Sequence, residues 1–287
     1  MKNFEGKVAV ITGAGSGMGR SLAVQLAGAG AQVAISDVDE VGLAETAELC
    51  AAAGHHPRAD ALDVSDRAAV HAYAESVAAA FGAVNLVINN AGIAMFGTVQ
   101  QSPYEDIEKV MDVDFWGVVH GTKAFLPYLI ASGDGHVVNI SSVFGLFSAP
   151  TQSSYNAAKF AVRGFTESLR QEMLLEGHPV KVTCVHPGGI KTNIVNLATA
   201  SNGADLDGIR ELFSTRMART SADDAAATIL RGVRKGKPRV LIGADAHLFD
   251  ATVRILGPAY QRIFATASSF LLRTVNKAPQ REEEKAA

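Results

Sequence analysis

The sequence predicts an α/β fold, a single doubly wound domain with a seven-stranded, mostly parallel sheet and helices on both faces. Seven short apolar runs alternate with longer, mostly Ala-rich stretches of helical periodicity. No linker-like segment interrupts this alternation, and strands that are joined through helices run parallel with right-handed crossovers. The 287 residues are 48% hydrophobic and 19% charged, a composition that provides a large core and excludes general disorder.

The expected strands occupy residues 7–12, 31–36, 58–62, 84–89, 136–141, 180–185 and 238–243. The expected helices occupy residues 17–29, 39–53, 66–81, 103–131, 153–176 and 221–235. The segment 188–220 is long and irregular, which is typical of a lid or a binding loop. We expect residues 1–245 to form the main domain with a lid at about 190–220, and residues 246–287 to add a helical extension and a charged tail to the same domain.

Composition excludes several classes of function. A net charge of -3 and a pI near 6.2 provide no basic surface for nucleic acid. Two cysteines cannot build a disulfide framework or a thiolate metal site, and the isolated histidines have no carboxylate cluster beside them. No apolar run reaches the roughly 18 residues that span a bilayer, and no leader pattern is visible. We expect a cytoplasmic protein without a metal.

A glycine-rich turn follows the first expected strand and leads into a helix. It reads T-G-x-x-x-G-x-G and comprises Thr12, Gly13, Gly15, Ser16, Gly17, Met18 and Gly19. Glycines allow the backbone to turn sharply and to approach a pyrophosphate, while the free amides of the helix N-terminus face the phosphates. The alternative is a plain glycine-rich turn, but its place between strand and helix favours a dinucleotide site.

Asp37 stands at the end of the second expected strand. A carboxylate there accepts hydrogen bonds from the ribose hydroxyls of NAD and repels the 2′-phosphate of NADP. Arg20 is the only basic residue close by in the sequence. The alternative is an aspartate that caps the next helix. We expect NAD to be preferred over NADP.

Tyr155 and Lys159 are spaced i and i+4, so they share one face of the expected helix. The lysine charge favours the phenolate and should lower the tyrosine pKa from its usual value near 10, by roughly two to three units at about 4–5 Å. Ser142 follows the fifth expected strand at the carboxyl edge of the sheet, where open parallel sheets bind ligands. Together the three side chains predict acid–base chemistry beside a dinucleotide site.

These motifs resemble the short-chain dehydrogenase/reductase family over about residues 5–245. The resemblance rests on the glycine turn, the Asp63-Val64 pair, N-N-A-G at 89–92, Ser142, Y-x-x-x-K at 155–159 and P-G-x-I-x-T at 187–192. It implies a Rossmann-type, NAD-binding and catalytic domain. It further implies that Asp63 and Val64 line the adenine pocket and that Lys159 binds the nicotinamide ribose. The remaining residues implied to lie at the cofactor are Asn90, Ala91, Gly92, Pro187, Gly188, Ile190 and Thr192.

The resemblance implies hydride transfer between nicotinamide C4 and a secondary alcohol or ketone, with Ser142 binding the substrate oxygen and Tyr155 as the acid or base. We expect a mostly apolar small molecule as substrate and a homodimer or homotetramer, with Phe115 and Trp116 packing in a helical interface. One alternative is a catalytically weak nucleotide-sensing protein of the same fold. A second is an epimerase or dehydratase, which the short region after residue 190 disfavours.

One position departs from the family pattern. Relatives carry a catalytic Asn in the helix after the fourth strand, and Asp114 stands there in MDVDFWG. An ionised carboxylate accepts hydrogen bonds but cannot donate one. We therefore expect Asp114 either to replace the Asn with little loss or to oppose the effect of Lys159 on Tyr155.

The C-terminal extension has apolar residues at helical spacing on both sides of Gly257-Pro258: Phe249, Val253 and Leu256, then Tyr260, Ile263 and Phe264. Arg254, Arg262 and Arg273 interrupt the apolar residues. We expect a helical cap on the domain or on a neighbouring subunit. The less favoured alternative is a basic amphipathic surface for a membrane.

Overall fold

A computed structural model describes residues 1–196, 198–200 and 206–266 of the chain. Its centre is a seven-stranded sheet in which all neighbouring strands are parallel. The spatial order is β11 (Arg239–Ile242), β7 (Val180–Pro187), β6 (Gly135–Ile140), β4 (Leu86–Asn89), β1 (Val8–Thr12), β2 (Gln32–Asp37) and β3 (Arg58–Ala61). The predicted α/β fold with seven main strands is confirmed.

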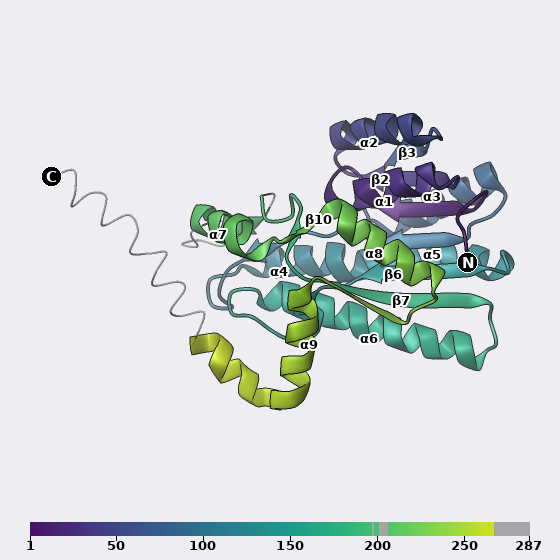
Figure 1. Ribbon diagram of the computed structural model, residues 1–287. Helices are drawn as coiled ribbons and strands as arrows, with labels where there is room; N and C mark the ends of the chain where they lie inside the picture. The colour runs from purple at the N-terminus through teal and green to yellow at the C-terminus, as the bar shows by residue number, and fades with distance from the viewer. Residues whose placement is uncertain (197, 201–205, 267–287) are drawn as a thin grey trace.

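Helices cover both faces of this sheet (Figure 1). One face carries α1 (Gly17–Gly28), α2 (Glu40–Ala53) and α8 (Ala222–Arg234), and the other carries α3 (Arg67–Phe81), α5 (Gly117–Ala131) and α6 (Ser153–Leu175). The side chains of Asp39, Asp66 and Ser221 accept hydrogen bonds from the free amides at the starts of α2, α3 and α8. Such caps satisfy donors that a helix itself cannot pair, so the sequence marks where these helices begin.

The core follows from alternation along the strands. On β1, Val8 and Val10 point to the layer of α3, α5 and α6, whereas Ala9 and Ile11 point to the layer of α1, α2 and α8. All four side chains are at most 3% exposed. A strand covered on both faces needs apolar residues at every position, which explains why these strands appear in the sequence as continuous apolar runs.

Strand order places a crevice at the carboxyl ends of β1 and β4. The chain moves outward from β1 through β2 to β3, then returns to β4 on the other side of β1 and continues to β6, β7 and β11. Loops that leave β1 and β4 therefore diverge toward opposite faces. Open α/β sheets bind ligands in such a crevice.

The expected helix over 103–131 is interrupted in the structure. It consists of α4 (Tyr104–Met111), a π-helical turn at Asp112–Trp116, and α5. The turn contains Asp114, whose side chain is 0% exposed. Wider turns of this kind are frequent at functional sites because they redirect a side chain without ending the helix.

The expected lid is more ordered in its described part than an irregular loop. Short strands β8 (Ile190–Lys191) and β10 (Thr220–Ser221) pair with each other, and β5 (Met95–Phe96) pairs with β9 (Thr199–Ala200). Between β9 and β10 the chain forms α7 (Leu206–Leu212) and a π-helical turn at Phe213–Met217. The sequence did not predict these strands and helical turns, because each is too short to produce a periodic hydrophobic pattern.

Beyond β11 the chain forms α9 (Ala244–Leu256), a 3-10 turn at Gly257–Ala259 and a helical segment over 260–266. Phe249, Val253, Tyr260 and Phe264 join an apolar cluster with Phe147 of the main domain. Leu256, in contrast, is 37% exposed. Arg273 and the charged tail lie outside the described residues. Within the described residues, no helix combines the length and the apolar character needed to cross a bilayer.

Candidate active site

The glycine turn has the backbone geometry that its sequence predicts. Gly13 and Gly17 adopt positive φ angles of 65° and 54°, a region that favours glycine. A Cβ at Gly19 would lie 2.0 Å from the carbonyl oxygen of Gly13. Ser16 is the extended N-cap of α1, and its side chain makes no cap hydrogen bond. The first amides of α1 thus lack a cap from that side chain, and helix amides of this kind can bind an anion.

Thr12 and Asn90 fasten this turn to the end of β4. The Asn90 Nδ2 atom donates to the carbonyl oxygens of Thr12 and Gly13, each at 3.0 Å. The backbone amides of Asn90 and Ala91 donate to the Thr12 hydroxyl, each at 3.1 Å. The two walls of the crevice are therefore held at a fixed separation.

Asp37 reaches from the end of β2 to the glycine turn, where its carboxylate accepts a hydrogen bond from the Gly15 amide at 2.7 Å. Arg20, the nearby basic residue, is turned toward α2. Its guanidinium donates to Thr46 Oγ1 at 2.9 Å and pairs with Glu45 at 2.8 Å. Arg20 also donates to the Gly15 carbonyl, so a carboxylate and a guanidinium both reach the glycine turn at Gly15.

Asp63 and Val64 follow β3. The Asp63 carboxylate accepts hydrogen bonds from the amide and the hydroxyl of Ser65, at 2.9 Å and 2.7 Å. Val64 is buried, and a Cβ at Gly117 would lie 2.7 Å from its Cγ2 atom. Val64 therefore packs against the first turn of α5, and the predicted role of both residues at an adenine ring stays a prediction.

The P-G-x-I-x-T segment forms the opposite wall. Pro187 ends β7, the Gly188 amide donates to the carbonyl oxygen of Ile242 at 2.9 Å, and Ile190 is buried in β8. Thr192 approaches the glycine turn, since a Cβ at Gly17 would lie 3.1 Å from the Thr192 Cγ2 atom. Gly17 and Thr192 line a pocket of about 360 Å³ between the glycine turn and the lid.

Tyr155 and Lys159 lie one turn apart on α6, with exposures of 8% and 3%. The Lys159 Nζ atom lies 5.3 Å from the centre of the Tyr155 ring. It donates to the carbonyl oxygen of Ile140 at 3.3 Å. Ser142 is the N-cap of the 3-10 turn Val143–Gly145, and its hydroxyl accepts from the Phe144 amide at 3.1 Å. The structure thus places the three predicted side chains at the carboxyl edge of the sheet.

Asp114 joins this group from the π-helical turn. Its Oδ2 atom lies 3.0 Å from Lys159 Nζ, and its Oδ1 atom accepts from the Ile93 amide at 2.7 Å. Gly92 gives the pair room, because a Cβ there would lie 3.3 Å from Nζ and 3.4 Å from Oδ1. Asp114 and Lys159 therefore form a buried ion pair beside Tyr155.

Burial and charge set the protonation of this group. Burial raises the pKa of Asp114, against the opposing effects of Lys159 and the Ile93 amide. Burial alone would lower the pKa of Lys159, but the charges of Asp114 and Tyr155 raise it overall. A lysine at 3.0 Å and a backbone amide on the other oxygen favour the charged form of Asp114, and the carboxylate in turn favours the charged form of Lys159.

The expectation of a lowered Tyr155 pKa is wrong for the protein alone. Burial raises the pKa of Tyr155, and although Lys159 lowers it, Asp114 raises it further. A hydrogen bond with Ser142 also lowers the pKa of Tyr155, as Lys159 does. The net direction is upward because removal of the phenolate from water outweighs one partly neutralised ammonium.

Sequence reasoning missed the Ile93 amide as a partner of Asp114. His186 is 0% exposed, and its Nδ1 atom donates to the carbonyl oxygen of Ser142 at 2.9 Å. Burial lowers the pKa of His186 to about 4 and that of His136 to about 3. Among the described residues, no group of His, Cys, Asp and Glu side chains suits a metal.

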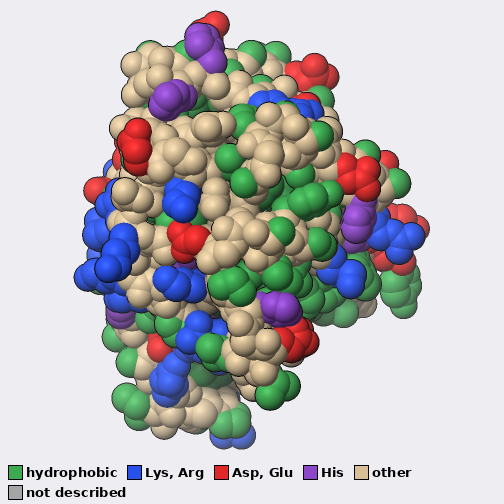
Figure 2. All heavy atoms as spheres, turned by 90° about the vertical axis from the view of Figure 1, so that its right-hand side faces the viewer, with side chains coloured by type: hydrophobic (Ala, Val, Ile, Leu, Met, Phe, Trp, Pro, Cys, Tyr) green, Lys and Arg blue, Asp and Glu red, His purple; other side chains and the backbone are tan. Residues whose placement is uncertain are grey.

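A second hollow, of about 380 Å³, lies between α8, β11 and α9 and is lined by Arg231, Lys235, Lys237 and His247 among others. Figure 2 shows Lys and Arg side chains gathered along one side of the molecule. The hollow includes the first residues of β11, so it lies at the amino end of the sheet, away from the crevice. Cations there complement the C-terminal dipole of α8.

Comparisons with known proteins agree with this geometry. The family model described as short chain dehydrogenase matches residues 7–202. The chain is 59% identical over 265 residues to the putative oxidoreductase SadH of Mycobacterium tuberculosis H37Rv, which covers 92% of this chain and 96% of that protein. It is 33% identical over 264 residues to mouse dehydrogenase/reductase SDR family member 7B, which covers 90% of this chain and 80% of that protein.

Solved structures show the same similarity. A short chain dehydrogenase/reductase from Burkholderia phymatum in complex with NAD superposes with a TM-score of 0.80 at 35% identity, covering 88% of this chain and 94% of that one. Levodione reductase superposes with a TM-score of 0.76 at 27% identity, covering 86% of this chain and 99% of that one.

Proposed function

This chain belongs to the short-chain dehydrogenase/reductase family of oxidoreductases, and on that premise we propose that it is an NAD-dependent alcohol dehydrogenase or ketone reductase. The reaction transfers a hydride between nicotinamide C4 and the carbinol or carbonyl carbon of a secondary alcohol or ketone. The observation that carries the proposal is the buried group of Tyr155, Lys159 and Asp114 at the crevice formed by β1 and β4.

The glycine turn fits a dinucleotide. Side chains at Gly13 and Gly19 would collide with Ala91 and with the Gly13 carbonyl, so the backbone leaves a cradle that only glycine allows. Asp37 stands where two ribose hydroxyls would donate to it, and its charge opposes a 2′-phosphate. Arg20 also reaches the glycine turn, where it donates to the Gly15 carbonyl, but it is paired with Glu45 at the same time. These contacts support NAD over NADP.

NAD would supply the hydride acceptor for alcohol oxidation and a positive charge on its oxidised nicotinamide. Ser142 would donate a hydrogen bond to the substrate oxygen and orient it toward Tyr155. The Tyr155 oxygen would take the hydroxyl proton during oxidation and return one during reduction. The Lys159 ammonium has an ion pair and a carbonyl contact, and it would use its third N–H on the nicotinamide ribose.

The surroundings of Tyr155 support an apolar substrate. Tyr155 belongs to a cluster with Met95, Val110 and Ala158, and Phe144 packs against it with its ring edge-on at 6.1 Å between centroids. These apolar groups surround the Tyr155 ring, so an apolar substrate group would suit the immediate neighbourhood of its hydroxyl.

Two exposed aromatic residues support self-association. Trp116 is 47% exposed and Phe160, on α6, is 39% exposed. Large aromatic side chains are enriched at interfaces between proteins. We expect a homodimer or homotetramer, measured as molar mass by light scattering after size-exclusion chromatography.

The test of the proposed reaction is a turnover screen with NAD and NADP against steroids, retinoids, fatty alcohols and small secondary alcohols, followed by Tyr155→Phe. The variant keeps the ring and removes the proton carrier, so kcat should fall by roughly 10²- to 10⁴-fold while NAD affinity stays within about threefold. Tyr104→Phe is the matched control, since Tyr104 is 80% exposed. A Tyr155→Phe variant with turnover within threefold of the parent would refute the assigned role. Tight NAD binding with no turnover of any alcohol would support the nucleotide-sensing alternative.

A further inference from the structure

The segment Ser142–Ala149, which we name the serine loop, is held by elements far apart in the sequence. His186 on β7 donates to the Ser142 carbonyl at 2.9 Å, and Arg163 on α6 donates to the Gly145 carbonyl at 3.4 Å. Asn156 donates to the Ala149 carbonyl at 2.9 Å. Besides the hydrogen bonds of its own 3-10 turn, the loop therefore depends on bonds from side chains of β7 and α6.

The C-terminal extension supplies a further support. The Tyr260 hydroxyl accepts a hydrogen bond from the Ser148 amide at 3.0 Å, and Tyr260 is only 7% exposed. Around this bond the Phe147 ring packs on Phe249 and Phe264, with centroids 4.6 Å and 5.0 Å apart. The extension thus covers the loop with aromatic rings and pairs a backbone amide of the loop.

The same rings continue to the candidate proton carrier. Phe147 packs edge-on against Phe144 at 5.2 Å, and Phe144 packs edge-on against Tyr155 at 6.1 Å. Aromatic pairs at these separations attract one another and resist displacement. An unbroken series of ring contacts therefore joins Tyr260 and Phe147 to Tyr155.

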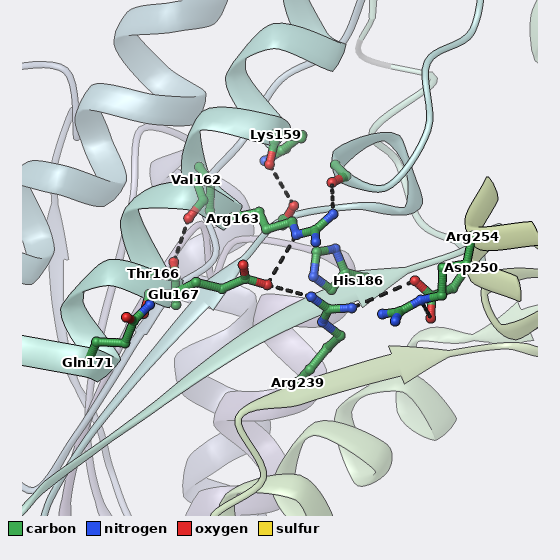
Figure 3. A network of polar contacts seen from close by, with 12 residues as sticks. Lys159, Val162, Arg163, Thr166, Glu167, Gln171, His186, Arg239, Asp250 and Arg254 are labelled. Carbon is green, nitrogen blue, oxygen red and sulfur yellow. Dashed lines mark hydrogen bonds and ion pairs between the residues drawn. The ribbon is translucent and has the colours of Figure 1, made fainter. Parts of the chain in front are cut away.

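Ion pairs tie the extension to the helix that carries Tyr155 and Lys159 (Figure 3). Asp250 on α9 lies 3.7 Å from Arg239, and Arg239 pairs with Glu167 on α6. Glu167 also pairs with Arg163 at 3.1 Å. Burial acts in the other direction, but the two guanidinium groups hold the pKa of Glu167 below its usual range. The extension is therefore anchored to α6 as well as to the serine loop.

We propose that Tyr260 is a positioning residue for the reaction, which fixes the serine loop so that the Ser142 hydroxyl faces Tyr155 in a productive geometry. The proposal rests on the proposed function of Ser142 and Tyr155. A displaced loop would leave cofactor binding intact and lower the rate, because a shift of about 1 Å at a reacting group can cost up to roughly 10²-fold. The C-terminal extension is in this way part of the catalytic architecture.

The experiment compares Tyr260→Phe with Ile263→Ala. Tyr260→Phe removes the acceptor of the Ser148 amide and retains the ring, whereas Ile263 lies on the same helical segment and is 56% exposed. Hydrogen–deuterium exchange of peptides that cover 142–150 needs no substrate. Loss of one hydrogen bond should speed exchange there by about fivefold in Tyr260→Phe and leave it unchanged in Ile263→Ala.

The kinetic arm uses NAD with 2-octanol, or with the alcohol that the screen shows to be turned over fastest. Tyr260→Phe should lower kcat by about tenfold with the KM for NAD unchanged. In a Ser142→Ala background the same substitution should have little further effect, because residues that act through one another are not additive.

Unchanged exchange at 142–150 in Tyr260→Phe would overturn the proposal, as would a loss of rate that is fully additive with Ser142→Ala. Failure of the proposed function has a different signature. In that case either no alcohol is turned over with NAD, or Tyr155→Phe and Ser142→Ala both leave turnover intact, whatever the exchange experiment shows.

Discussion

Replacing Asp114 by Asn tests how the buried ion pair sets the proton affinity of Tyr155. The Asp114 carboxylate lies 3.0 Å from Lys159 Nζ, which in turn lies 5.3 Å from the centre of the Tyr155 ring. Asn keeps the shape and can still accept the hydrogen bond from the Ile93 amide, but it carries no charge. The substitution therefore removes one negative charge that raises the pKa of Tyr155.

The magnitude follows from Coulomb's law. The two distances place the carboxylate no more than about 8 Å from the ring centre, and a unit charge at that separation contributes about 2 kcal/mol, or roughly 1.5 pKa units, at an effective dielectric constant near 20. Part of this gain is lost, because burial lowers the pKa of Lys159 once its carboxylate partner is gone. We expect the pKa of Tyr155 to fall by about one unit. The phenolate then forms at lower pH, so the rate of alcohol oxidation should rise at a pH about one unit lower.

The assay is kcat against pH for oxidation, measured for the parent and for Asp114→Asn with saturating NAD. The variant should be active, and its affinity for NAD should be nearly unchanged because Asp114 is not expected to touch the cofactor. Asp112→Asn is the matched control, since it removes the same charge from the same helical turn without an ion pair to Lys159. An unmoved profile in Asp114→Asn would refute the electrostatic argument. Loss of activity would instead identify the carboxylate as an essential relay.

Two further predictions concern the cofactor and acid stability. Asp37→Ala should weaken NAD binding by roughly 10- to 100-fold and bring the affinities for NAD and NADP, measured by titration calorimetry, closer together. The control Glu40→Gln should change neither affinity. Equal affinity of the parent for both cofactors would contradict the role of Asp37. The buried neutral histidines have folded pKa values of about 3 for His136 and about 4 for His186, below the ordinary 6.5, so their stabilising effect is complete above pH 6.5 and is lost as pH falls toward those values. Chemical unfolding should show that the free energy of unfolding is a few kcal/mol smaller at pH 5 than at pH 7, about 2 kcal/mol for each histidine. His186→Asn should make this difference smaller. Equal free energies of unfolding at the two pH values would contradict this reasoning.

Local patterns in the sequence determined the fold class and the candidate residues. The run over β1 predicted a strand buried on both faces, and the glycine spacing predicted a turn whose residues must lack side chains. The i, i+4 spacing placed Tyr155 and Lys159 on one face of a helix. Each of these features depends on steric limits and periodicities within a few residues, so each can be read without knowledge of distant neighbours.

The tertiary structure decided what depends on distance and burial. Asp114 and Lys159 are separated along the chain by all of α5 and β6, so only the fold shows that they form a buried ion pair and that Ile93 completes it. The direction of the Tyr155 pKa changed for the same reason, because the desolvation of a phenolate is set by every atom packed around it. The bond from Ser148 to Tyr260 joins residues 112 positions apart. Such contacts leave no periodic trace in the sequence, since the two partners are brought together only when the sheet and its helices have assembled.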